Sequence, residues 1–155
     1  MAGNKQEANN FLLDDLDRKI VNHLVAHGRD SYREMAKQLH VSTATVMHRM
    51  KSLQEVVKKV GAQLNYDALG YDVSVIINIR IAKGRLFDVE KKIAVHENVQ
   101  AVYDVTGDYD AVILARFKST KQMDKFLKQI QTYDFVERTM TQIILNTMKE
   151  ESLRI

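Results

Sequence analysis

The spacing of the apolar residues changes its period near residue 60, and this change divides the chain into two differently built parts. From Leu13 to Leu53, apolar residues recur every three to four positions, which is the period of an amphipathic helix. From Val73 onward they alternate with polar residues, which is the period of a half-buried strand. A chain of 155 residues is long enough for one domain or for two small ones. The two periods favour a helical domain followed by a domain built around a sheet.

Composition restricts the class of protein further. A hydrophobic content of 45% with 28% charged residues is typical of a globular chain. The absence of cysteine excludes disulfides, cysteine-ligated metals and thiol nucleophiles, and we expect a cytoplasmic location. No apolar run reaches the roughly 18 residues of a membrane span, so no membrane partner is expected. Residues 1–12 are expected to form a flexible arm.

Three helices are expected in residues 13–55. Each is preceded by a residue whose side chain can accept a hydrogen bond from a backbone N–H of the first helical turn. The S-x-x-E pattern of Ser31 and Glu34 also forms a capping box. The predicted caps, in chain order, are Asp14 or Asp15, Ser31 and Ser42.

The second and third predicted helices are separated by about three residues. This is the connection of a helix-turn-helix, whose second helix enters the major groove of DNA. Residues 33–59 carry six basic side chains against two acidic ones, which favours a partner that carries phosphates. A three-helix bundle that packs only against another protein has the same spacing, and this alternative stays open at this point.

Polar residues at the helix starts and along the third helix are the candidates for DNA contact. Hydroxyl groups can donate to phosphate oxygens or base edges, and Arg49 can make a bidentate contact with guanine. The predicted DNA-binding residues are Ser31, Tyr32, Ser42, Thr43, Thr45, His48, Arg49, Lys51 and Ser52.

Residues 56–71 are expected to form a strand and a hinge between the two domains. Val56 and Val57 favour extended backbone, and Gly70 favours a turn. Lys58 and Lys59 either contact the DNA backbone as a wing or keep an edge strand from aggregating. The sequence leaves both readings open.

Residues 72–149 follow the order strand, helix, strand, strand, helix, strand. The first strand, DVSVIINIRIA, alternates cleanly, and a second capping box at Ser119 and Gln122 begins the last helix. We therefore predict an α+β chain: a winged-helix-like helix-turn-helix domain joined to a ferredoxin-like βαββαβ domain. Both helices then cover one sheet face, and the apolar residues Ile76, Ile143 and Leu145 favour a homodimer through the other. Residues 150–155 are expected to be a tail.

Three segments of the chain resemble the Lrp/AsnC family, the leucine-responsive or feast/famine transcription regulators. They are LDDLDRKIVNHLVAHGRDSYREMAKQLHVSTATVMHRMKSL, LGYD (Leu69 to Asp72) and VTGDYDAVILAR. The resemblance implies a DNA-binding domain joined to an effector domain, dimers that assemble into tetramers or octamers, and control by small amino acids. The chain departs from the family at His40, where glycine is usual, and after Leu53, where a short glycine-containing segment is missing.

The turn TGDYD is the candidate effector site. By itself, Gly107-Asp108 between two strands is a hairpin turn. Asp108 and Asp110 can also bind the ammonium group of an amino acid, while backbone N–H groups bind its carboxylate. The resemblance favours this second use, places the pocket between subunits and adds two threonines of the last strand. The predicted effector-binding residues are Gly107, Asp108, Tyr109, Asp110, Thr139 and Thr141.

Metal binding and catalysis find little support in the sequence. His23 and His27 stand at i, i+4 without an evident third ligand, so no metal or other cofactor is expected. No catalytic motif is present, so we expect no enzyme activity. The favoured function is a transcription regulator that binds a partly palindromic operator in double-stranded DNA and responds to an amino acid. The alternative is an amino-acid-binding regulatory subunit of a metabolic enzyme, with no DNA binding.

Overall fold

The structure of the protein, a computed structural model, describes residues 12–155, apart from the side chains of Val89 and Glu90. All of the predicted arm except Leu12 lies outside the described residues, as does the side chain of Val89. The chain forms two compact units. The helical unit runs up to Gln63 and includes Glu150–Ile155, and the sheet unit comprises Leu64–Lys149.

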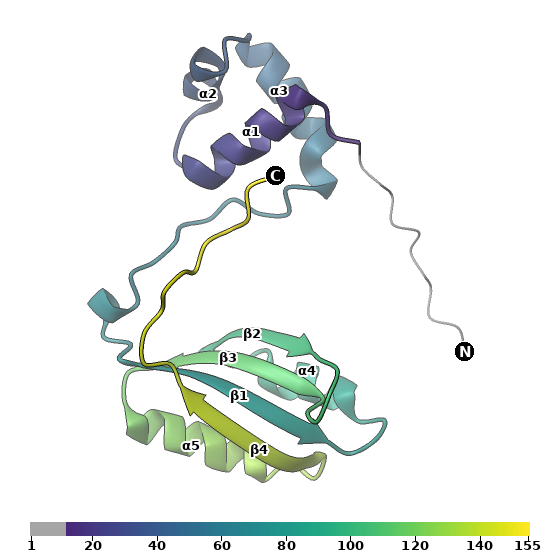
Figure 1. The fold of residues 1–155 in the computed structure, drawn as a ribbon, viewed down its shortest axis with the longest axis vertical. Coiled ribbons are helices and arrows are strands. Elements are labelled where there is room, and N and C mark those ends of the chain that lie inside the picture. Colours follow the sequence, from purple (N-terminus) through teal and green to yellow (C-terminus); the bar gives the residue numbers. More distant parts are fainter. Residues whose placement is uncertain (1–11) are drawn as a thin grey trace. The chain divides into compact units, whose positions relative to one another are not determined.

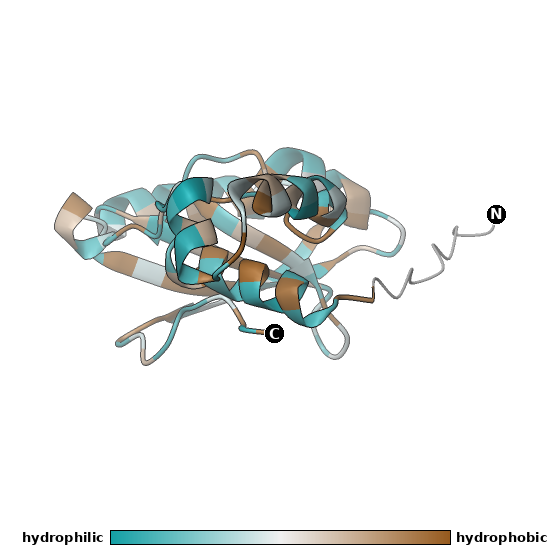
Figure 2. Cartoon of the chain, turned by 90° about the horizontal axis from the view of Figure 1, so that it is seen from above, coloured by the Kyte–Doolittle hydropathy of each residue, from teal (hydrophilic) through white to brown (hydrophobic). Residues whose placement is uncertain are grey.

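The helical unit contains α1 (Asp15–Ala26), α2 (Tyr32–Gln38) and α3 (Thr43–Ser52), followed by a 3₁₀ turn at Leu53–Glu55. Figure 2 shows brown and teal alternating along these helices, as expected when one side of each is buried. The predicted caps are confirmed, and Asp14 rather than Asp15 caps α1. Five residues form the buried centre of the unit: Ile20, Met35, Ala36, Val46 and Leu53.

The turn between α2 and α3 is a Schellman motif. The N–H of Val41 donates to the carbonyl of Ala36 at 3.0 Å, and the N–H of His40 donates to the carbonyl of Lys37 at 3.4 Å. His40 has a φ of 55°, the left-handed conformation that usually selects glycine. The turn predicted from the sequence therefore forms with histidine in it, at a cost in backbone strain.

Replacing His40 by glycine is expected to raise the free energy of unfolding of the helical unit by about 0.5–1 kcal/mol. Glycine adopts positive φ without a Cβ penalty, although its freedom in the unfolded chain offsets part of the gain. Urea denaturation followed by circular dichroism measures the change. The matched control is His40→Ala, which keeps a Cβ and should bring no gain. A glycine variant less stable than the parent would show that the imidazole contributes more than the strain costs.

The segment between the units differs from the prediction. Residues 56–71 contain a 3₁₀ turn at Asp67–Leu69 but no strand, although Val56 and Val57 favour extended backbone. A strand requires a neighbour to complete its ladder hydrogen bonds, and residues 12–155 of the single chain supply none to this segment. The predicted strand is thus wrong for the isolated chain.

The sheet unit has the predicted order of elements. It consists of β1 (Val73–Ile81), α4 (Leu86–Ile93), β2 (Val99–Asp104), β3 (Ala111–Phe117), α5 (Thr120–Gln131) and β4 (Val136–Ile143). All strand pairs are antiparallel in the order β2-β3-β1-β4, and Figure 1 shows α4 and α5 on the same side of the sheet. The predicted α+β fold, a helix-turn-helix followed by a ferredoxin-like unit, is confirmed.

The helices cover one face of the sheet and leave the other face bare. Alternate residues of β1 and β3, from Val73 to Ile81 and from Ala111 to Phe117, are buried against Ile93, Phe126 and Ile130 of the helices. On the other face, register places Ile76, Leu114, Val112, Tyr103, Ala101 and Met140. Ile143 was predicted on this bare face, but it pairs with Val75 and therefore lies on the helix side. Its strand also ends there, so Leu145 falls beyond the sheet.

Candidate functional site

The outward face of α3 is set by the residues that its inward face needs. Val46 and Leu53 are buried, which turns the opposite side of the helix to solvent. That side carries Ala44, Met47, His48 and Lys51, spaced at i, i+3, i+4 and i+7, and all four are exposed. The predicted DNA-binding set was chosen from polar residue types and therefore omits Ala44 and Met47, although they lie on the same face as His48 and Lys51.

Several predicted DNA-binding hydroxyls are occupied within the fold. The Ser31 hydroxyl donates to Glu34 Oε2 at 2.7 Å, and Ser42 Oγ accepts from the N–H of Thr45 at 3.0 Å and lies 2.8 Å from the Thr45 hydroxyl. Ser52 Oγ donates to the carbonyl of Arg49 at 2.8 Å. These side chains shape the helix ends. Two other members of the predicted set, Tyr32 and Thr43, are exposed at the starts of α2 and α3.

Arg49 is placed differently from the prediction. Its guanidinium Nη1 donates to Asp14 Oδ2 at 2.6 Å and to Asp17 Oδ1 at 3.2 Å, so it ties α3 to the start of α1. The side chain of Asp17 is only 9% exposed. In the structure this guanidinium neutralises two carboxylates of its own unit, so a guanine contact requires it to leave them, and that contact stays a prediction.

Several contacts stabilise the negative charge of the carboxylates at the start of α1. The backbone N–H of Asp17, and then the Arg49 guanidinium, hold the pKa of the Asp14 carboxyl below its usual value. Hydrogen bonding to Asp14 in turn raises the pKa of Arg49. The first turn of a helix also favours negative charge through the helix dipole. The three residues form a closed ionic cluster that holds two helices of the unit together.

His23 has a structural partner rather than a metal ligand set. Its Nε2 lies 3.0 Å from Asp30 Oδ2, and the same carboxylate oxygen accepts from Gln38 Nε2 at 3.1 Å. His23 is buried, and the network runs from it to the exposed Gln38, which links α1 to α2. Within residues 12–155, no group of three or more potential metal-ligating side chains comes together.

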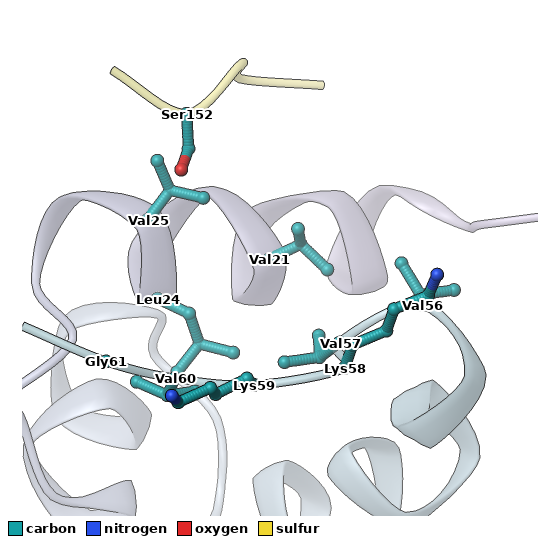
Figure 3. Close-up of a pocket in the computed structure, with 10 residues that line it drawn as sticks. All are labelled: Val21, Leu24, Val25, Val56, Val57, Lys58, Lys59, Val60, Gly61 and Ser152. Atoms are coloured by element: carbon teal, nitrogen blue, oxygen red, sulfur yellow. The ribbon is translucent and has the colours of Figure 1, made fainter. Parts of the chain in front are cut away.

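A hollow of about 390 Å³ lies between α1 and the segment that follows α3 (Figure 3). Its walls are valines and Leu24, with Lys58, Lys59, Gly61 and Ser152 at the edges. None of the ten lining residues is acidic, so the hollow offers no carboxylate to the ammonium group of an amino acid. This recess has mainly apolar side-chain walls and no acidic group, so it is a poor match for a zwitterionic effector.

The predicted effector turn connects β2 to β3, and one of its two acids is occupied. Asp110 Oδ2 accepts from the N–H of Ile81 at 2.8 Å, at the register shift in β1. The N–H of Asp110 donates to the carbonyl of Ile79 at 3.0 Å. Gly107 has a φ of 119° and is exposed together with Asp108. Asp110 therefore fixes the shape of the turn, and Asp108 presents its carboxylate outward.

The two predicted threonines lie on β4 at the edge of the sheet. Thr139 pairs with Ile79 and Thr141 with Ile77, so both are on the helix side of the strand. Gln131 of α5 donates to the Thr139 hydroxyl at 3.4 Å. Because Ile79 also receives the N–H of Asp110, Thr139 and the effector turn flank the same end of β1 from opposite sides. Thr141 lies two residues further along β4.

These features define a class: a DNA-binding regulator in which a helix-turn-helix unit is joined to a ferredoxin-like unit. Residues 13–54 match the AsnC-type helix-turn-helix domain, and residues 74–153 match the Lrp/AsnC ligand binding domain. An HTH-type transcriptional regulator of Pyrococcus abyssi is 39% identical over 142 residues, which cover 90% of this chain and 97% of the relative. The chain belongs to the Lrp/AsnC family of transcription regulators.

Solved structures agree with this assignment. Escherichia coli AsnC matches with a TM-score of 0.84 and 27% identity, over 94% of this chain and all of that one. A Neisseria meningitidis transcriptional regulator, solved as a complex with L-methionine, matches with a TM-score of 0.82 over 91% of this chain and 95% of its own. At 21% identity, the second comparison shows a shared fold. None of the helices that the structure describes is long and apolar enough to cross a membrane.

Proposed function

We propose that this regulator binds a partly palindromic operator as a dimer in the cytoplasm and that a small amino acid controls it. The observation that carries the DNA-binding geometry is the Schellman turn, which fixes α2 and α3 as a helix pair and leaves the outer side of α3 exposed. A two-fold symmetric dimer offers two such helices, so the half-sites should lie one helical turn, about 34 Å, or a multiple apart. Of the residues predicted from the sequence, Tyr32, Thr43, His48 and Lys51 are the ones we assign to DNA contact.

Two apolar surfaces support self-association. The bare face of the sheet presents Tyr103 at 58% exposed and Met140 at 38%, beside Ile76 and Leu114. Apolar surface of this kind favours contact between identical subunits. The recess beside α1 adds apolar surface in the helical unit. Two surfaces on one chain are compatible with a dimer that assembles further, into a tetramer or an octamer.

An amino-acid effector is supported by the chemistry of the turn between β2 and β3. Asp108 supplies a carboxylate for an ammonium group, and the positive φ of Gly107 exposes backbone N–H groups to a carboxylate. Asp110 and Thr139 hold the turn and the neighbouring edge of the sheet from either side of β1. The methionine bound by the Neisseria regulator is a ligand of this class.

A thermal-shift screen with the twenty amino acids tests the effector assignment. A ligand present at 100 times its dissociation constant should stabilise the protein by about 2.7 kcal/mol, which raises the melting temperature by several degrees. Asp108→Asn should abolish the shift, because the amide no longer balances the ammonium charge. The matched control is Asp124→Asn, an exposed acid on α5 that pairs with Lys128 at 2.6 Å. Absence of a shift with all twenty would argue that the loop is only a hairpin turn.

A further inference from the structure

We propose that Ala44 and Met47 of α3 determine operator sequence by packing against the 5-methyl groups of thymines in the major groove. The inference rests on the proposed DNA-binding mode and goes beyond it by naming the residues that read bases and the bases they read. It starts from the side chains that α3 presents outward, Ala44, Met47, His48 and Lys51.

Helix α3 lacks most of the side chains that read bases through paired hydrogen bonds. The side chains that read guanine and adenine through paired hydrogen bonds are arginine or lysine for guanine, and asparagine or glutamine for adenine. The sequence of α3, TATVMHRMKS, contains no asparagine or glutamine, and its one arginine is held by Asp14 and Asp17. Only Lys51, in the last turn, is left to make a charged contact with a guanine or a phosphate.

The outward face of α3 presents apolar side chains instead. Met47 is apolar and flexible, yet half of its surface is exposed, at 50%. Ala44 is exposed in the first turn, where recognition helices approach base edges most closely. Thymine is the base that displays an apolar group, its 5-methyl, in the major groove. The chemistry of this face therefore matches runs of A·T base pairs.

The spacing of Ala44 and Met47 along α3 decides which base pairs they can contact. Ala44 and Met47 are three residues apart, so their Cα atoms are separated by about 4.5 Å along the helix axis. Successive bases of one strand are about 3.4 Å apart. The two side chains therefore address neighbouring base pairs. The short side chain of Ala44 lets the helix approach closely, and the longer Met47 reaches over the next step. His48 and Lys51, further along the same face, provide polar contact at its border.

The test uses the full-length protein and an operator obtained by selection from random DNA duplexes. Each thymine of the selected half-site is replaced in turn by deoxyuridine, which pairs identically but lacks the methyl group. We expect about a fourfold loss of affinity at each contacted thymine, from the transfer free energy of one buried methyl group. For Met47→Ala, the loss at one of these positions should shrink to less than twofold.

Two further variants separate apolar reading from other contributions. Met47→Gln keeps the length of the side chain but adds an amide, and repeated selection with it should favour adenine at the position that Met47 reads. Lys51→Ala should weaken all duplexes alike, reduce the salt dependence of binding by about one charge and leave the deoxyuridine effect intact. Both positions are exposed, and circular dichroism checks that the variants fold.

The outcomes distinguish the inference from the function on which it rests. If the protein prefers its selected duplex but deoxyuridine weakens binding at no position, thymine methyl reading is overturned while DNA binding stands. If selection enriches no duplex over random DNA, sequence-specific DNA binding fails and the inference fails with it. If Met47→Ala changes the oligomeric state instead of the deoxyuridine effect, this face packs against protein and the inference is wrong.

Discussion

Replacing Ile20 by alanine is expected to lower the free energy of unfolding of the helical unit by about 2–5 kcal/mol. Ile20 is completely buried in the core of the helical unit, so removal of its side chain leaves a cavity that closely packed neighbours fill only in part. A unit of this size has a total stability on the order of 3–9 kcal/mol. The change therefore removes a large share of it, and DNA binding should be lost near physiological temperature.

The same substitution should leave the sheet unit folded. The core of that unit is formed by its own strands and helices, from Val73 to Phe135, and contains no residue of the helical unit. We expect Ile20→Ala to unfold in two steps, with any amino-acid-dependent stabilisation confined to the second. Lys19→Ala, an exposed position on α1, is the matched control and should change stability by less than about 0.5 kcal/mol. A single transition shifted as a whole would show that the two units share their stability.

Local signals account for what the sequence predicted well. The starts of α1, α2, α3 and α5 depend on a contact between residues three apart, as at Ser31 and Glu34, and such pairs can be seen without knowing the fold. Alternation likewise assigned the buried side of β1, because successive side chains of a strand point to opposite faces. The tight turn at His40 was expected from the short separation of the second and third predicted helices, and its positive φ agrees with the glycine that is usual there in the family.

The sequence did not reveal contacts between residues that lie far apart along the chain. Arg49 was assigned to DNA because it is a cation on a helix thought to bind DNA, but its partner Asp14 lies 35 positions earlier. Asp110 was assigned to the effector, yet one of its oxygens caps a backbone N–H of β1, 29 positions away. The strand expected near Val56 needs a neighbour that the single chain does not provide. Periodicity reports which side of an element is buried and is silent about which charged groups meet.

The ionic cluster of Arg49 leads to the second large effect that we expect. Arg49→Met keeps much of the aliphatic length but removes the cation, leaving the nearly buried Asp17 carboxylate without its partner. A buried charge that loses its counter-ion destabilises a fold strongly. We expect a clearly lower urea midpoint for the helical unit, while the base preference of the molecules that remain folded stays that of the parent. Denaturation and operator selection, run on the same preparation, measure the two effects separately.

Removing the stranded charge should restore the fold. In the double variant Asp17→Asn with Arg49→Met, both ionic partners are neutral, so most of the lost stability is expected to return.

The stability deficit of Arg49→Met relative to the parent protein should also narrow below about pH 4. The pKa of Asp14 is lowered in the folded protein, by the Asp17 N–H first and Arg49 after it, so its stabilisation is present above the ordinary carboxyl pKa and lost as acid protonates it.

Lys51→Ala is expected to change DNA affinity but not stability, which is the opposite of what we expect for Arg49→Met. Lys51 is exposed on the outward face of α3, so its loss should lower DNA affinity without moving the urea midpoint. An Arg49→Met variant that kept its midpoint but lost discrimination at one base pair would behave as a base-reading residue does. In that case the contacts with Asp14 and Asp17 would describe only the DNA-free state, and the guanidinium would exchange two carboxylates for a guanine on binding. Equal midpoints for Arg49→Met and the parent are therefore the result that would restore arginine to the reading face.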